Sequence, residues 1–118
     1  MIDFIQGGIA KGHRGQIRFV NDFDMSQVKR FYIIKNTDLD LVRGWRAHRM
    51  EQRWFYVLSG KFAVDVVAID NWDSASTDLP VEKIIVDSIE NRVLHLSAAY
   101  ATAFQALEAH SELLVFPD

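Results

Sequence analysis

Short runs of β-branched and aromatic residues, separated by polar turn clusters, recur along almost the whole sequence. Residues 16–19 alternate polar and apolar side chains, and residues 54–58 are aromatic and β-branched. Further runs of this kind cover residues 31–34, 61–69, 83–86, 92–96 and 111–116. No long amphipathic helix interrupts them. Many short strands at regular spacing are typical of a β-sandwich or barrel, so we predict an all-β fold.

Several local features refine this prediction. Ser59 and Gly60 separate two strand-like runs, which predicts a hairpin. The alanines of residues 98–110 favour a helix by propensity, but the surrounding pattern favours a strand, and we predict β structure there. Residues 31–34 are expected to be a short buried strand, and residues 70–80 a loop. The large aromatic residues expected in the core are Trp45, Trp54, Phe55, Tyr56, Phe62 and Phe104.

Composition limits the classes of function. The 118 residues show no linker or repeat, so one domain spanning residues 1–118 is expected. The sequence contains no cysteine and no apolar stretch of membrane-spanning length, and it begins without a signal-peptide pattern. We therefore expect a cytoplasmic protein with no membrane contact. A net charge of −3 argues against nonspecific nucleic-acid binding.

A local basic cluster stands out against this acidic total. Arg43, Arg46, Arg49 and Arg53 are four of the thirteen basic side chains and fall within eleven residues. Such a patch on an acidic protein indicates a small anionic ligand. The alternative is a solvated rim whose charges are paired with those of Asp38, Asp40 and Glu51.

Residues 42–48 (VRGWRAH), followed by residues 52–60 (QRWFYVLSG), resemble the central motif of two related families. The dTDP-sugar 3,4-ketoisomerases carry Arg-Gly-x-His-Ala-His and a strand ending in Val-Ser-Gly, and the dTDP-4-dehydrorhamnose 3,5-epimerases carry Arg-Gly-Leu-His-x-Gln. The resemblance extends over roughly residues 12–116. It implies a cupin fold, which is a double-stranded β-helix or jelly-roll barrel with only short helical or turn segments. It also implies a dTDP-4-keto-6-deoxyhexose ligand in deoxysugar (polysaccharide) biosynthesis, with no cofactor.

The resemblance assigns catalytic roles to three residues. Arg46 stands where the families carry their histidine base, and arginine does not deprotonate at working pH. His48 matches the second histidine of the ketoisomerase motif and is the remaining base candidate. Arg53 replaces the lysine or glutamine of the next strand and could stabilise an enolate oxygen together with Arg46.

Further residues are expected to contact the substrate. Arg43 is expected to face the barrel lumen, and Arg14 to bind the diphosphate from the neighbouring subunit, which implies a homodimer with strand exchange. Thr102 matches the second family histidine, and Tyr100 lies in the same segment. One of Tyr32, Tyr56 and Tyr100 could donate a proton or stack on a base. The tyrosine acid of the epimerases would lie beyond the final strand of this sequence.

Two alternatives remain open at this level. The chain could be a non-catalytic binding or accessory cupin that has lost the acid–base residues. It could instead be a metal-dependent cupin, since His48 and Glu51 are present, although Arg46 displaces the first metal ligand and disfavours a cation. No metal is expected. Arg49 and the histidines outside the motif, His13, His95 and His110, are expected to be structural or on the surface.

Overall fold

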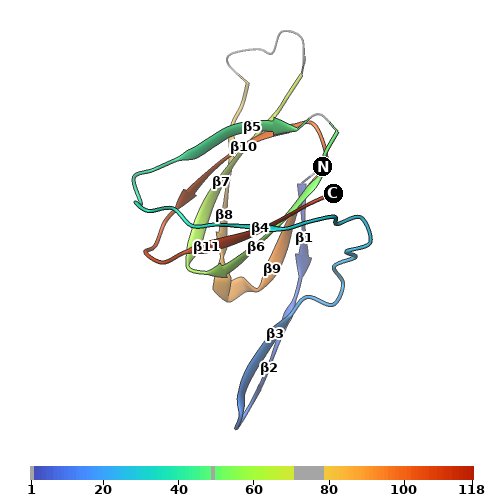
Figure 1. Ribbon diagram of the computed structural model, residues 1–118, viewed down its shortest axis with the longest axis vertical. Coiled ribbons are helices and arrows are strands. Elements are labelled where there is room, and N and C mark those ends of the chain that lie inside the picture. The colour runs from blue at the N-terminus through green and yellow to red at the C-terminus, as the bar shows by residue number, and fades with distance from the viewer. Residues whose placement is uncertain (1, 49, 71–78) are drawn as a thin grey trace.

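The computed structural model describes residues 2–48, 50–70 and 79–118, with His48 described by its backbone alone (Figure 1). The described strands form a five-stranded antiparallel sheet (β1-β9-β6-β11-β4), a four-stranded antiparallel sheet (β5-β10-β7-β8) and a two-stranded hairpin (β2-β3). The strands are β1 Ile2–Gln6, β2 Gly8–Gly12, β3 Gly15–Phe19, β4 Tyr32–Ile34, β5 Arg43–His48, β6 Arg53–Ser59, β7 Lys61–Ala68, β8 Glu82–Asp87, β9 Arg92–Leu96, β10 Tyr100–Ala106 and β11 Glu112–Pro117. A single 3₁₀ turn, η1 (Ser88–Glu90), is the only helical element described. The all-β prediction is confirmed.

The core lies between the two larger sheets, because alternate residues on each strand point to the inside. Phe55 and Val57 on β6 and Leu94 on β9 come from the five-stranded sheet, and Phe62 and Val64 on β7 come from the four-stranded sheet. All five side chains are at most 1% exposed. Burying the apolar area of these side chains supplies the main drive to fold, at about 25 cal/mol per Å².

The predicted hairpin at Ser59–Gly60 is wrong. β6 pairs with β9 and β11, whereas β7 pairs with β8 and β10, so Gly60 is a corner that carries the chain from one sheet to the other. Gly60 has φ +75°, and a Cβ there would lie 1.9 Å from Ser111 Oγ. A turn between adjacent strands and a corner between sheets both need glycine, so the local sequence could not distinguish them.

The alanine-rich stretch 98–110 forms β10, as predicted, because tertiary packing outweighs helix propensity. β10 lies between β5 and β7, where Ala101, Ala103 and Ala106 are buried. The small side chain of Ala103 lets β5 come close, since a Cβ on Gly44 would lie 2.5 Å from Ala103 Cβ. The small alanine side chain therefore allows β5 to pack closely against β10.

Two burial predictions need correction. The run 31–34 forms β4, but only Ile34 is buried and Phe31 is 64% exposed, because β4 is an edge strand of the five-stranded sheet. Trp45 is 52% exposed, since β5 is the edge of the other sheet, and Tyr56 is only half-buried. The other aromatic residues expected in the core, Trp54, Phe55, Phe62 and Phe104, are buried.

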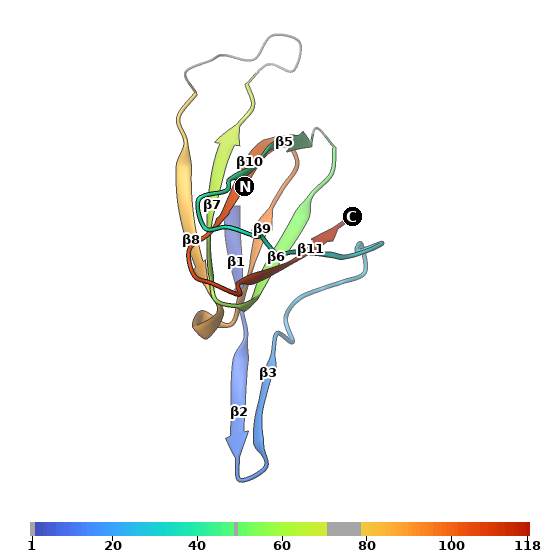
Figure 2. The ribbon, with the colours of Figure 1, turned by 60° about the vertical axis from the view of Figure 1, so that its left-hand side comes forward.

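The β2–β3 hairpin, called the arm below, projects from the barrel (Figures 1 and 2). Its base is fixed by Asn91, whose Nδ2 donates to Gly8 O (2.5 Å) and Phe19 O (3.1 Å). The Tyr56 hydroxyl donates to Asn91 Oδ1. Arg18 also ties the arm to the barrel by donating to Leu58 O at 2.9 Å. The sequence pattern predicted β3 but neither β1 nor β2.

Three further predictions concern the loop at residues 70–80, the setting of His95 and membrane contact. Residues 71–78 of the predicted loop lie outside the described part of the chain. His95 has a structural setting: its ring stacks on Trp54, and its two nitrogens lie 2.9 Å from Asp3 Oδ1 and 2.8 Å from Gln52 Oε1. Among the described residues, no helix combines the length and apolar character needed to span a bilayer.

Candidate functional site

A cavity of about 490 Å³ opens between the two larger sheets, next to their edge strands β4 and β5. Strands β6 and β10 supply its inner wall through Arg53 and Thr102, while β5 supplies Gly44 and Arg46. The full lining is Arg30, Tyr32, Ile33, Ile34, Lys35, Arg43, Gly44, Arg46, Arg53, Thr102 and Phe104. A cavity of this size, with a mixture of apolar and polar walls, is large enough for a small-molecule ligand.

The lining of this cavity is strongly cationic. Five of its side chains are Arg or Lys, and among the described side chains that line it none is Asp, Glu or His. Three of the five have acidic neighbours among the described residues: Arg30 Nη2 lies 3.9 Å from Glu51, Lys35 Nζ lies 3.9 Å from Glu112, and Glu51 also acts on the charge of Arg53. Exposed pairs at such distances offset little charge. The cavity therefore favours an anionic ligand although the whole protein is acidic.

Arg53 is the most buried charge in the cavity. Its side chain is 2% exposed, with Nη1 donating to Thr102 Oγ1 at 2.7 Å and Nη2 to Tyr100 O at 3.2 Å. Its Nε has no hydrogen-bond partner among the described residues. Burial lowers the pKa of Arg53, while the charges of Tyr32 and Glu51 act in the opposite direction. A guanidinium stays protonated in proteins, so Arg53 places a fixed positive charge in the inner wall.

Arg46 lies beside this buried charge. In the β5–β10 register, Arg46 is opposite Thr102, the residue to which Arg53 is bonded. Directly opposed residues in antiparallel strands share a face, and both residues line the cavity. Arg46 is exposed, so it reaches the open part of the cavity. The backbone of His48 lies opposite Tyr100 at the end of β5, and its side chain lies outside the described part of the structure.

The structure thus brings together four of the predicted site residues: Arg43, Arg46, Arg53 and Thr102. Arg43 Nε donates to Asn36 Oδ1 at 3.3 Å, which is a neutral partner and not an aspartate of the expected rim. Arg49, which is expected on the surface, lies outside the described residues.

Three other predicted site residues are placed differently. Tyr100 packs against the core, and its carbonyl oxygen accepts a hydrogen bond from Arg53 Nη2. Tyr56 does not line the cavity, because β6 turns it to the face opposite Arg53, where it holds Asn91. Arg14 lies at the tip of the arm.

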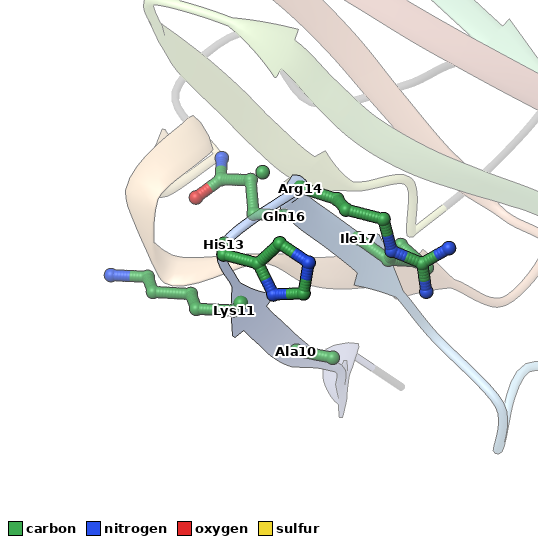
Figure 3. A pocket seen from close by; sticks show the side chains of 8 residues that line it. Ala10, Lys11, His13, Arg14, Gln16 and Ile17 are labelled. Atoms are coloured by element: carbon green, nitrogen blue, oxygen red, sulfur yellow. The ribbon is translucent and has the colours of Figure 1, made fainter.

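The arm tip forms a second, open concavity of about 500 Å³, lined only by residues 10–17 (Figure 3). Lys11, His13 and Arg14 surround it, and Figure 3 shows Lys11 and Arg14 extending in opposite directions from the turn. Figures 1 and 2 place the arm tip at one end of the molecule and β5 toward the other. Arg14 therefore does not reach the cationic cavity of its own chain.

Sequence reasoning missed two cations of the cavity wall, Arg30 and Lys35, whereas Tyr32, a candidate for proton donation or stacking, does line the cavity. The available signal was the pair of basic residues on either side of the run 31–34. Within the described ranges, no three His, Asp or Glu side chains group as metal ligands would.

Neither a protein-family model nor a curated protein matches the sequence. Solved structures do match its fold. The 3,4-ketoisomerase QdtA from Thermoanaerobacterium thermosaccharolyticum, in complex with TDP, superposes with a TM-score of 0.77 at 16% identity, over 98% of this chain and 79% of that one. The TDP-quinovose 3,4-ketoisomerase WlaRB from Campylobacter jejuni gives 0.74 at 19% identity, over 98% and 83%.

An epimerase, the RmlC protein of Mycobacterium tuberculosis, gives a TM-score of 0.76 at 17% identity, over 98% of this chain and 62% of that one. This chain has the cupin fold of these enzymes. The resemblance of the motif thus agrees with the fold, which superposes on these ketoisomerases over 98% of this chain. The chain spans about four fifths of the ketoisomerases' length and less than two thirds of the epimerase's.

Proposed function

We propose that this cupin binds a dTDP-linked keto sugar in the cationic cavity and belongs to deoxysugar biosynthesis as an epimerase or ketoisomerase. The observation that carries the proposal is the lining itself, whose described residues include five cations and no carboxylate. A sugar nucleotide presents a diphosphate that such a wall would hold by charge-assisted hydrogen bonds. Two solved structures of the same fold contain ligands of this class: QdtA with TDP-4-keto-6-deoxyglucose, and the 3'-monoepimerase ChmJ of Streptomyces bikiniensis with dTDP-quinovose.

The proposed chemistry is proton transfer at the carbon next to a ketone. A base removes the proton, the electron pair moves to the carbonyl oxygen, and the resulting enolate is reprotonated on carbon. We assign the base to His48, because none of the arginines of the motif can accept a proton at working pH. Arg53 holds the enolate oxygen, and Arg46 neutralises adjacent negative charge. Burial of Arg53 strengthens this role, because charges act more strongly away from water.

A second candidate is a binding or accessory cupin without catalysis. The observation that favours it is Arg46, which lines the cavity at the position where the related families have their base. The described lining contains no His, Asp or Glu that could take over proton transfer. Both candidates require the same ligand and differ only in turnover.

Calorimetry and isotope exchange together test both candidates. Titration with dTDP should show binding, and the Arg53→Met variant should bind it more weakly. Incubation with dTDP-4-keto-6-deoxyglucose in deuterated water should introduce deuterium at C3 or C5 if the chain is catalytic, and His48→Asn should abolish the exchange. Binding without exchange selects the non-catalytic candidate, and absence of dTDP binding rejects both. Arg46→His would restore the family base, and a gain in exchange would identify a drifted enzyme.

We also propose that the chain acts as a homodimer in which the arm of one copy reaches the cavity of the other. An isolated two-stranded hairpin is barely stable in water. This arm carries an apolar face, because Ile17 is paired with Ala10 and Phe19 with Gly8 in its register. Ile17 is 68% exposed and Phe19 38% exposed. A second copy would cover this face and bring Arg14 to the partner's diphosphate.

We place the dimer in the cytoplasm, since a protein without cysteine needs no oxidising compartment.

Light scattering after gel filtration tests the dimer. The wild type should show twice the 13.6 kDa mass of one chain. Ile17→Asp should dissociate it, because the charge falls on the apolar face of the arm. Gln16→Asp is the matched control, since Gln16 pairs with Lys11 on the other face. A monomeric wild type would reject the exchange of arms.

A further inference from the structure

Arg53 differs from the other cations of the cavity in how firmly its side chain is held. Its Nη1 donates to Thr102 Oγ1 at 2.7 Å, and its Nη2 donates to Tyr100 O at 3.2 Å. Hydrogen bonds at both terminal nitrogens restrict the rotation of the planar guanidinium group. The other four cations of the lining are exposed, so their side chains keep more rotamer freedom.

Both acceptors belong to β10, which lies between β5 and β7 in the four-stranded sheet. Arg53 comes from β6 in the five-stranded sheet, so its side chain reaches across from one sheet to the other. Thr102 is paired with Arg46 on one side and with Val66 on the other. A β-branched side chain has little freedom at χ1, so the hydroxyl of Thr102 is an acceptor held in one place.

We infer that Thr102 is a positioning residue, which acts on the ligand only through the guanidinium group of Arg53. This inference rests on the proposed function, in which Arg53 contacts the ligand. Thr102 is 0% exposed, and its hydroxyl accepts from Arg53. This role differs from the direct substrate contact that the resemblance implies for Thr102.

The sign of the effect follows from the timing of the ordering. With the Thr102 hydroxyl present, the Arg53 side chain is ordered when the chain folds, and ligand binding does not have to order it. Without the hydroxyl, this ordering would fall on binding and lower the affinity. The N–H group that Arg53 directs at Thr102 points into the buried wall, so the ligand cannot replace the lost acceptor.

Thr102→Val tests this role, because valine keeps the branched shape of threonine and removes the acceptor. Calorimetry should show that Thr102→Val binds dTDP about tenfold more weakly than the wild type, which is the usual worth of a hydrogen bond to a charged group. Thr102→Ser is the matched control. It keeps the hydroxyl and should bind dTDP within about threefold of the wild type.

A second substitution separates an effect through Arg53 from a general disturbance of the cavity. In the Arg53→Met background the positioned group is gone, while the four exposed cations of the lining remain to hold dTDP. Thr102→Val should change the affinity by less than about twofold in that background, because its effect depends on Arg53. The melting temperature of each variant checks that it is folded.

Nuclear magnetic resonance on isotope-labelled arginine gives a readout that needs no ligand. The Nη protons of Arg53 should give separate signals in the wild type and in Thr102→Ser, because the two hydrogen bonds slow the rotation of the guanidinium group. Their absence in Arg53→Met assigns these signals. They should merge or broaden in Thr102→Val.

The outcomes separate the two claims. Undiminished binding of dTDP by Thr102→Val, or an equal loss in Thr102→Ser, overturns the positioning role while the proposed function stands on the affinity of the wild type. A loss of the same size in the Arg53→Met background also overturns it, as do Arg53 signals that stay separate in Thr102→Val. If the wild type does not bind dTDP, the proposed function fails, and the positioning role fails with it.

Discussion

Asn91 joins the arm to the barrel, and its replacement should cost far more stability than a polar residue normally contributes. Its side chain donates to Gly8 O and Phe19 O, one on each strand of the arm, and accepts from the Tyr56 hydroxyl. Only 3% of Asn91 is exposed, so the groups that it leaves behind in Asn91→Ala would be largely shielded from water. Asn91 also has φ 49°, a left-handed conformation that asparagine tolerates better than alanine.

The magnitude follows from these contacts. Each lost hydrogen bond of this kind costs about 1 kcal/mol, and the left-handed backbone adds about 1 kcal/mol for alanine. Asn91→Ala should therefore destabilise the protein by about 3 to 5 kcal/mol, a large part of the stability of a domain this size. Asn91→Gly should cost about 1 kcal/mol less, because glycine relieves the backbone term. Tyr56→Phe removes one hydrogen bond only and should cost about 1 kcal/mol.

Urea unfolding followed by tryptophan fluorescence measures these differences, and the slope of each transition checks that unfolding stays two-state. Amide exchange of residues 8–19 should speed up in Asn91→Ala before the barrel is affected, since local opening at the arm is then easier. A loss below about 1 kcal/mol for Asn91→Ala would refute the reasoning. So would equal losses in Asn91→Ala and Asn91→Gly, which would remove the backbone term.

Three further results are expected. Gly60→Ala should lower the free energy of unfolding in urea by at least about 2 kcal/mol, because Gly60 has a positive φ and the new Cβ would overlap with Ser111. Gly12→Ala is the control: no atom lies within 4 Å of its new Cβ, so it should change the free energy of unfolding by less than about 0.5 kcal/mol. Leu94→Ala should cost about 2 to 5 kcal/mol, because the side chain is fully buried between the sheets, and a smaller loss would mean that the core collapses around the gap. The affinity for dTDP should fall as salt rises from 0.05 to about 0.5 M, since screening weakens the cationic wall, and a salt-independent affinity would contradict binding through these charges.

Much of this fold could be predicted from the sequence alone. The strand at residues 54–58, the alternation in 61–69 and the strand at 92–96 all follow from local patterns, because a half-buried strand needs apolar side chains at every second position. The basic cluster also indicated an anionic ligand, and Arg43, Arg46 and Arg53 do line one cavity. Charge density is a local property, so a linear sequence can reveal it.

Other features depended on the tertiary structure. Only the pairing of strands decides that Gly60 turns between sheets, that Trp45 lies outside on an edge strand, and that Tyr56 faces away from Arg53. Only the packing of the two sheets brings Arg30, which precedes β4, into the same cavity as Arg46 on β5. These outcomes are non-local, because each depends on partners dozens of residues away. The sequence thus determined most of the strands and the positive charge of residues 43–53, and the tertiary structure decided which of these side chains line one cavity.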